Sequence, residues 1–311
     1  MALTGSVGGS VTAGSSSAPT GTRRGDGRAA TAFLLPGAIG FVVFTAFPIA
    51  ASLVMSFFDW PVLGSPKFIG LQNFVELFTT DPVFKSALLN TTVFVVLYVP
   101  INLVLSMSLA VWISPRIVGR RYYRVLFFIP AVTPMVGNAV VFALLYTPNG
   151  LIDSTFVSLF GVHAPNFLGS DSWALPAVVL MSVWQGFGYN LLVFSAALDA
   201  VPPSLTEAAA IDGAGPARQF FSVVLPLLSP SLFFATVLTL ISSFQVFVQP
   251  YILTGGGPGN ATTTLVMYLY QSGFQFFRLG FAAAIAWVLF IIIMVITGVQ
   301  FLGQKKWVHY D

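Results

Sequence analysis

Residues 207–226 read EAAAIDGAGPARQFFSVVLP, a compact and charged insert between two strongly apolar runs. Alanines follow Glu207, and the segment from Gly213 to Pro216 is rich in glycine and proline. Alanine is a strong helix former with little side-chain bulk, whereas glycine and proline end helices. The stretch therefore predicts a short helix outside the lipid that can approach another surface closely.

The residues before Glu207 favour the same helix. Pro202 and Pro203, followed by the hydroxyl of Ser204, are typical of a helix N-terminus. Glu207 adds a carboxylate near the first turn, where negative charge is favourable. The alternative is an ordinary solvated loop with good capping. Against it, the exposed face would carry alanine and isoleucine, and the insert is longer than a tight connection needs.

The composition around this insert is that of a membrane protein. Of the 311 residues, 56% are hydrophobic and 7% are charged, whereas a soluble domain carries about 25% charged residues. Apolar runs of about 20 residues cross a bilayer as helices. The predicted fold class is an all-α polytopic membrane protein with six transmembrane helices, at about 31–57, 88–113, 122–147, 173–198, 219–248 and 279–303.

These spans form one predicted transmembrane domain over residues 31–303, in which residues 199–218 connect the fourth span to the fifth. Residues 1–30 are rich in Gly, Ser, Thr and Ala and predict a disordered tail, and residues 304–311 form a second, short tail. A signal peptide is the rival interpretation of the N-terminus. The apolar run after Arg28 is too long for its hydrophobic region, and no small-residue cleavage site follows.

The distribution of basic residues predicts the orientation. Loops on the cytoplasmic side carry an excess of Lys and Arg. Only Lys67, Lys85 and Arg278 lie on one side of the predicted spans. The other side, which we expect to be cytoplasmic and to hold both termini and the Glu207 loop, carries Arg23, Arg24, Arg28, Arg116, Arg120, Arg121, Arg124, Arg218, Lys305 and Lys306.

Other segments predict features of the connections. Asn73 begins NFVELF, which favours an amphipathic helix at the membrane surface, and the connection at 147–172 is rich in turn signals. Prolines kink helices, and several fall in or near the spans, namely Pro48, Pro100, Pro130, Pro134, Pro226 and Pro230.

The 207–226 stretch resembles a known signature. Permease subunits of ABC importers carry E-A-A, three residues, G, nine residues and then an aliphatic residue-x-L-P, and Glu207, Gly213, Val223 and Pro226 fit this spacing. Val223 stands where isoleucine is commoner. The chain is similar to carbohydrate-uptake permeases of the maltose and glycerol-phosphate type over about residues 33–303, including FIGLQNF from Phe68, ALLNTT from Ala87 and LTGGGP from Leu253.

This resemblance implies a mechanism and a set of partners. The Glu207 helix would dock into a separate ATPase subunit and couple ATP binding to alternating access. Glu207 would be the polar docking contact, Ala208, Ala209 and Gly213 would allow close packing, and Asp212 and Arg218 would orient the loop. The expected partners are a second homologous permease subunit, two ATPase subunits and an extracytoplasmic solute-binding protein, in the plasma membrane of a bacterium.

No cofactor is expected on this chain, because it lacks the G-x-x-x-x-G-K-[ST] motif that cradles phosphates. ATP and Mg²⁺ would bind the partner ATPase. The glycine-rich segment Gly255, Gly256, Gly257 and Pro258 has no lysine and is expected to form a turn on the outer side. It would face the solute-delivering receptor.

The solute path is expected between the fourth and fifth spans, from which the family's substrate contacts come. The candidates are Ser182, Gln185, Gly186, Tyr189, Asn190, Thr239, Ser243 and Gln245. The family often has Asn where this chain has Ser182 and Ser243. Hydrogen bonding between helices is the alternative role. Only Arg124, at one entrance, places a basic residue in a span, which favours an uncharged sugar. Glycerol 3-phosphate or a glycerophosphodiester stays open, because a helix N-terminus or a partner could bind the anion.

Two other classes of membrane protein fit the sequence less well. A secondary transporter usually needs carboxylates or ion sites inside the membrane, and no predicted span contains Asp or Glu. An enzyme needs a clustered set of acid, base or metal-binding groups, but the two histidines, His163 and His309, lie far apart in the sequence and cysteine is absent. No metal site and no binding to nucleic acid are therefore expected.

Overall fold

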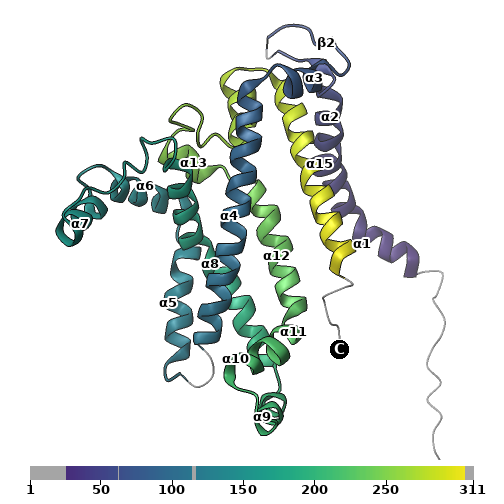
Figure 1. The fold of residues 1–311 in the computed structure, drawn as a ribbon. Coiled ribbons are helices and arrows are strands. Elements are labelled where there is room, and N and C mark those ends of the chain that lie inside the picture. Colours follow the sequence, from purple (N-terminus) through teal and green to yellow (C-terminus); the bar gives the residue numbers. More distant parts are fainter. Residues whose placement is uncertain (1–25, 62, 114–116, 305–311) are drawn as a thin grey trace, which may run out of the picture. The chain divides into compact units, whose positions relative to one another are not determined.

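A computed structural model describes residues 26–61, 63–113 and 117–304, and Figure 1 gives its ribbon. The chain divides into two compact units at Ala51 and Ser52. Most of the predicted N-terminal tail lies outside the described residues, as do Arg23, Arg24, Arg116 and the segment that holds Lys305, Lys306 and His309. The structure therefore does not test these predictions.

The first unit contains most of the first span. Helix α1 (Asp26–Phe41) continues through a π-helical turn, η1 (Val42–Ala46), into α2 (Phe47–Met55). The backbone N–H of Phe47 bonds the carbonyl of Val42, and this wider turn comes directly before Pro48, which has no N–H to offer a regular helix. The stretch Thr31–Met55 is long and apolar enough to cross a membrane.

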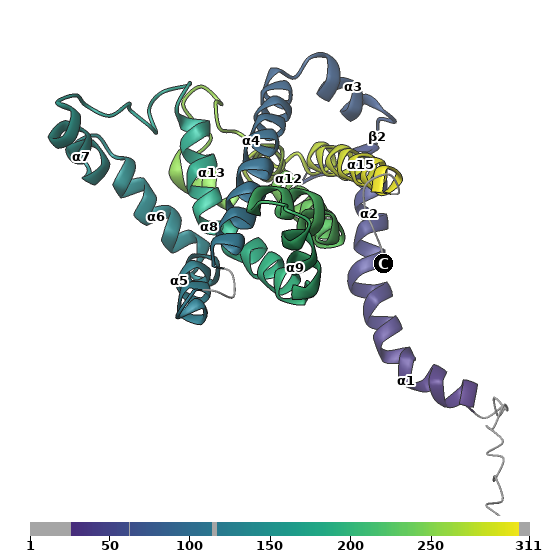
Figure 2. The ribbon, with the colours of Figure 1, turned by 60° about the horizontal axis from the view of Figure 1, so that its bottom comes forward.

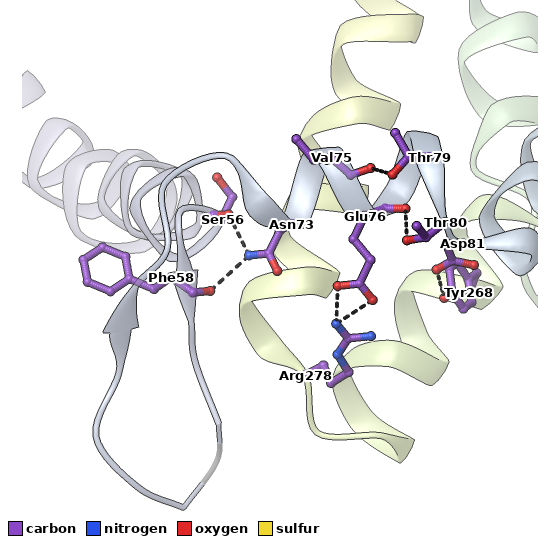
Figure 3. Close-up of polar contacts among 10 residues, drawn as sticks. All are labelled: Ser56, Phe58, Asn73, Val75, Glu76, Thr79, Thr80, Asp81, Tyr268 and Arg278. Carbon is purple, nitrogen blue, oxygen red and sulfur yellow. Dashed lines mark hydrogen bonds and ion pairs between the residues drawn. The ribbon is translucent and has the colours of Figure 1, made fainter.

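The second unit begins with a feature absent from the all-α prediction. Strands β1 (Phe58–Asp59) and β2 (Lys67–Phe68) pair antiparallel, with Phe58 opposite Phe68. Helix α3 (Gln72–Thr79) follows, where the amphipathic pattern predicts it. The Asn73 amide donates to the carbonyls of Ser56 (2.9 Å) and Phe58 (3.1 Å), as Figure 3 shows, and so holds α3 against the hairpin.

Three long helices match the predicted spans closely: α4 (Pro82–Trp112), α8 (Ala174–Ala200) and α15 (Leu279–Gln304). Helix α4 packs along α8 and also contacts α12 and α14. The side chains of Phe94, Met181 and Ile285 are among those fully buried between these elements. Asp81 starts α4, because its carboxylate accepts the backbone N–H groups of Val83 (2.8 Å) and Phe84 (2.9 Å).

The third predicted span differs from the structure. Instead of one helix over 122–147, α5 (Arg120–Val132) and α6 (Met135–Tyr146) are separated at Thr133 and Pro134. Helix α6 continues toward α7 (Leu151–Phe160), and Figures 1 and 2 show both leading away from α5. The apolar helical stretch long enough to span is Met135–Phe160. The cause is Pro134, which cannot donate the backbone hydrogen bond that would continue α5.

The fifth predicted span is also broken. A limb formed by α10 (Pro216–Gln219), η2 (Phe220–Val224) and α11 (Leu225–Leu227) meets α12 (Ser229–Phe244) at a bend of 69°. Helix α12 ends at Phe244, short of the predicted residue 248. Counting this bent pair as one span, the described residues contain up to six helices that could cross a membrane.

The two ends of the second unit carry different elements. Helix α9 (Pro203–Ile211) lies with α10 at one end of the bundle, whereas α3 and α13 (Val248–Leu253) lie toward the other, as Figure 1 shows. Helix α14 (Leu265–Tyr270) and the π-helical turn η3 (Gln271–Gln275) lead back to α15. The candidate solute path and the candidate docking helix are therefore on separate parts of the molecule.

Candidate functional site

A cavity of about 770 Å³ lies among α4, α5, α8, α12 and α13. In the part of the chain that the structure describes, none of its lining side chains is charged. Aromatic rings, including Phe94 and Phe247, contribute to its walls. The polar lining residues are Tyr98, Thr133, Gln185, Tyr189, Asn190, Thr239, Ser242, Ser243, Gln245 and Gln249.

Most of the predicted path residues reach this cavity. Gln185, Gly186, Tyr189, Asn190, Thr239, Ser243 and Gln245 all line it. Ser182 does not, because it points into the protein core, where it is 3% exposed and its hydroxyl donates to the carbonyl of Val178 at 2.7 Å. Ser182 belongs to a different face of α8 from Gln185 and Tyr189. Ser182 therefore lies outside the cavity that the other predicted path residues line.

Gln185 closes the break between α5 and α6. In a continuous helix the carbonyl of Pro130 would accept the N–H of residue 134, which proline lacks. The side-chain amide of Gln185 donates to this carbonyl at 2.7 Å and to the carbonyl of Thr133 at 3.2 Å. Its oxygen accepts from the amide of Asn138. Both polar ends of Gln185 are therefore used to hold the wall of the cavity.

Asn190 links α8 to α4 and α12 beside the cavity. Its amide nitrogen donates to Asn102 Oδ1 in α4 at 2.7 Å and to Thr239 Oγ1 in α12 at 2.8 Å. All three residues are buried. Ser106 adds a further contact between α4 and α8, because its hydroxyl lies 2.9 Å from the carbonyl of Phe187. Such networks fix the register between helices where water does not compete.

Gly186 permits the close approach of α4 to α8. A Cβ atom at this position would collide with the hydroxyl of Tyr98. The Tyr98 ring stacks on Phe94, with centroids 5.2 Å apart, and its hydroxyl lies 3.4 Å from the amide of Asn102. Gly186 therefore leaves the space that brings an aromatic hydroxyl to the cavity wall.

The candidate docking helix is α9, which covers the Glu207 stretch as predicted. Its N-cap is Pro202 and no side chain caps it, so the hydroxyl cap expected from Ser204 is not formed. Glu207 and Ala208 are exposed and Ala209 is half-buried. Ile211 is 88% exposed. The helix thus presents a carboxylate, small side chains and two large apolar side chains, Leu205 and Ile211, to its surroundings.

The end of α9 is closed by backbone geometry. Gly213 has φ of +82°, which non-glycine residues rarely adopt, and the N–H of Ala214 bonds the carbonyl of Ala209 at 2.9 Å. The Gln219 amide then donates to the carbonyl of Ala214 at 2.7 Å and ties α9 to α10. Among the described residues, Asp212 and Arg218 form no ion pair with each other. Gln219 therefore stabilises the loop from within, and a role of Asp212 and Arg218 in orienting it stays a prediction.

A network missed by the sequence links α5 to the approach of α9. Asp199, near the end of α8, accepts from Arg124 at 2.8 and 3.1 Å and from Arg120 at 3.2 Å. Bidentate arginine–carboxylate pairs have fixed geometry. The start of α5 is therefore held to the segment that leads directly into the docking helix.

The glycine-rich segment forms a turn, as expected for its composition. Gly255 and Gly256 have positive φ values of +62° and +92°. Gly256 is buried and its carbonyl accepts from the hydroxyl of Thr263 at 3.1 Å. The Asn90 amide of α4 donates to the carbonyls of Asn260 (2.7 Å) and Thr263 (3.0 Å). Gly257 and Pro258 are half-buried, and the exposed residues of the turn are Gly255, Gly259 and Asn260.

A bundle of apolar helices around an uncharged polar cavity, with a short exposed helix at one end, defines a multi-pass membrane permease. No group of three or more histidine, aspartate or glutamate side chains that could hold a metal ion occurs in the described residues. Residues 102–307 match the family model of the binding-protein-dependent transport system inner membrane component, and the chain belongs to this family. It is thus a transport component of an ABC importer and carries no catalytic role.

Curated relatives extend the match over almost the whole chain. The probable ABC transporter permease protein YesP of Bacillus subtilis is 36% identical, covering 93% of this chain and 94% of YesP. The sn-glycerol-3-phosphate transport system permease protein UgpA of Yersinia pestis is 40% identical, over 79% and 83% of the two chains. The sulfoquinovosyl glycerol transport system permease protein SmoG of Agrobacterium fabrum is 34% identical, over 88% and 90%.

Solved structures share the fold. A bacterial ABC transporter involved in the import of the acidic polysaccharide alginate contains a chain with a TM-score of 0.77 and 22% identity, covering 91% of this chain and 96% of that one. A complex of the alginate transporter with its alginate pentasaccharide-bound periplasmic protein gives a TM-score of 0.78 at 21% identity, with the same coverage. The helical permease architecture predicted from the sequence is therefore confirmed.

Proposed function

We propose that this chain forms half of the translocation path of an ATP-driven importer for a sugar or a related polyol, and that it works by alternating access. The observation that carries the solute class is the lining of the cavity. It combines hydroxyl and amide groups with aromatic rings and has no charged side chain among the described residues. Such a surface suits hydroxyl groups and the apolar faces of a sugar ring.

The names of relatives widen the range of solutes. UgpA is named for sn-glycerol 3-phosphate and SmoG for sulfoquinovosyl glycerol, and both solutes join an anionic group to a polyol. If this importer takes such a solute, the cavity of this chain contacts the hydroxyl-bearing part. The anionic group would need a cation or helix N-terminus from elsewhere, such as the second permease subunit.

Helix α9 is proposed as the point where a separate ATPase subunit docks. Glu207 would be the polar contact, and Ala208, Ala209 and Gly213 would let the two surfaces approach closely. The exposed side chain of Ile211 supports this role, because a large apolar group at 88% exposure gains from burial in a groove. In this arrangement ATP and Mg²⁺ bind the two ATPase subunits.

The remaining assignments follow from this orientation. The α9 end and both termini face the cytoplasm of a bacterial cell, and the turn around Gly255 and Pro258 faces the extracytoplasmic binding protein. The second half of the path is a homologous permease subunit. The excess of basic residues on the α9 side supports this topology.

A secondary transporter without an ATPase is the competing function. The test is reconstitution of the chain with the second permease, the ATPase and the binding protein encoded beside it. Uptake of radiolabelled glucose, maltose, myo-inositol and glycerol 3-phosphate into proteoliposomes is measured with and without enclosed ATP. We expect uptake that requires both ATP and the binding protein. Uptake driven by an ion gradient alone would contradict the proposal.

A further inference from the structure

The polar side chains of the cavity differ in whether their hydrogen bonds are already used. The amide of Gln185 bonds two backbone carbonyls and its oxygen accepts from Asn138. The amide nitrogen of Asn190 bonds Asn102 and Thr239. The hydroxyl of Ser243 donates to the carbonyl of Leu240 at 2.7 Å. These groups maintain the cavity walls, and a solute would have to break existing bonds to use their donors.

Gln249 is in the opposite situation. It lies in α13, lines the cavity and is 8% exposed. Within the described residues, no hydrogen bond involves its side chain. Its amide atoms are not among the described buried atoms that lack a partner, so they stay accessible. Because Gln249 lines the cavity, partners for its N–H and C=O groups come from there. A sugar hydroxyl both donates and accepts, and therefore suits a free amide.

Gln245 provides a second free amide next to it. It is the C-cap of α12, it lines the same cavity and its side chain is exposed there without a hydrogen bond to the described residues. Phe247 lies between these two glutamines in the sequence and also lines the cavity. Its ring stacks on Tyr251 with centroids 5.1 Å apart and contacts Tyr270 at 5.2 Å. The ring is therefore held in place by other rings.

We propose that Gln249, together with Gln245 and the ring of Phe247, reads the hydroxyl pattern of the solute, while Gln185 and Asn190 hold the cavity in shape. This inference rests on the proposed function, because it assumes that the cavity is the path of a hydroxyl-bearing solute. It extends solute recognition beyond the face of α8, where Tyr189 also lines the cavity, to the segment where α12 ends and α13 begins. Helix α13 packs against both α6 and α8, so this segment is in contact with the helices around it.

The absence of cysteine from the chain allows a direct test that needs no knowledge of the solute. Gln249→Cys, Gln245→Cys and Ser182→Cys are each made in the complete importer, with cysteines removed from its other subunits. Proteoliposomes are treated with a cationic methanethiosulfonate reagent and labelling of this chain is measured by mass. We expect labelling at 249 and 245 and none at 182, because Ser182 does not reach the cavity. An unlabelled Gln249→Cys overturns the proposal.

The uptake rate of a solute tests whether the Gln249 amide contributes to recognising it. Gln249→Leu keeps the size of the side chain and removes its amide, and Gln72→Leu is the control, since Gln72 is exposed in α3 away from the cavity. With saturating binding protein, we expect Gln249→Leu to lower the uptake rate of the imported probe about three- to tenfold, the effect of one lost hydrogen bond. The same probe should protect Gln249→Cys from labelling.

The outcomes separate this inference from the proposed function. If the wild-type importer carries a neutral probe but Gln249→Leu matches Gln72→Leu, the solute class stands and the role of Gln249 is wrong. If the importer carries glycerol 3-phosphate and none of the neutral probes, and Gln249→Leu again matches Gln72→Leu, the extension to anionic polyols stands and the role of Gln249 is wrong. If no probe is carried although the ATPase is active, both are contradicted.

Discussion

Asn190 and Asn102 lie side chain to side chain across the packed pair α8 and α4, with the amide nitrogen of one 2.7 Å from the carbonyl oxygen of the other. Asn102 is fully buried and Asn190 nearly so. Asn190 lines the cavity, as does Thr239, which adds α12 to the same bond network, whereas Asn102 does not reach it. The helices around the cavity are therefore held in register by a network that includes two of its lining side chains.

The first prediction concerns this network. Asn190→Leu should lower the free energy of unfolding by about 1 kcal/mol, the scale of hydrogen bonds between membrane helices, because it leaves Asn102 and Thr239 without their donor. Thermal unfolding in detergent measures the loss. A double-mutant cycle with Thr239→Val gives the coupling, and additive losses would contradict a direct bond.

The second prediction concerns Gly186. Gly186→Ala should lower both stability and uptake, because its methyl group meets the Tyr98 hydroxyl. Tyr98→Phe removes that hydroxyl and should partly rescue the glycine variant. Uptake and melting temperature are compared for the two single variants and the pair. If the pair is as impaired as Gly186→Ala alone, the close approach is not the cause.

The third prediction concerns Asp81, which caps α4 and accepts from the hydroxyl of Tyr268, as Figure 3 shows. Asp81→Ala should cost about 1–2 kcal/mol of stability, since it removes a helix cap and leaves a buried hydroxyl unpaired. Asp171→Ala, at an exposed position, is the control and should be neutral. Melting temperatures in detergent that do not differ between these variants would exclude a capping role.

The contribution of Asp81 and Tyr268 to the free energy of unfolding should depend on pH. Burial raises the pKa of Tyr268, with a further contribution from Asp81, so its hydroxyl stays protonated and keeps donating. An unfolded tyrosine ionises near pH 10, and the folded protein then binds more protons than the unfolded one. This contribution to stability should be constant below about pH 10 and fall above it. Tyr268→Phe should remove that alkaline loss, which a series of melts at rising pH would reveal.

The fourth prediction concerns the docking helix. Glu207→Lys reverses an exposed charge that has no hydrogen bond among the described residues, so the fold should be unaffected while ATPase binding is lost. Co-purification of the ATPase and ATP-dependent uptake should both fall at least tenfold. Asp171→Lys makes the same kind of change away from α9 and should leave both unaltered. Normal co-purification of Glu207→Lys would contradict docking through this side chain.

Local sequence signals predicted much of this fold. The apolar runs of α4, α8 and α15 and the alanines and glycine around α9 act over neighbouring residues, and their helices form close to the expected positions. The breaks in the third and fifth spans were harder to predict. Pro134 and Pro226 indicate kinks, but whether a kink becomes a full break depends on which partners satisfy the freed carbonyls. For Pro130 one partner is the nearby hydroxyl of Thr133 and another is Gln185 on a different helix, and no local pattern reveals the second.

The candidate site divides in the same way. The sequence located two of the helices that line the cavity, and seven of the eight proposed path residues reach it. Ser182 does not reach it, because α8 packs against α4 and α5 in a rotation that buries this side chain. Gln249 was missed because it lies past the end of α12, in a segment that composition assigned to the span and its edge. The sequence alone does not show whether the amide of a glutamine is free to bind a solute, because that depends on its neighbours in the folded structure.

The bond from Gln185 to the carbonyl of Pro130 has a consequence for how this transporter can evolve. A substitution at Gln185 would remove the bonds that join α8 to the break between α5 and α6, although the Thr133 hydroxyl would still bond the Pro130 carbonyl, so drift at that position is constrained by folding. Gln245 and Gln249 hold nothing in place, and mutation there is free of that constraint. Substitutions at these two positions could therefore change which solute is transported while the rest of the membrane bundle stays unchanged.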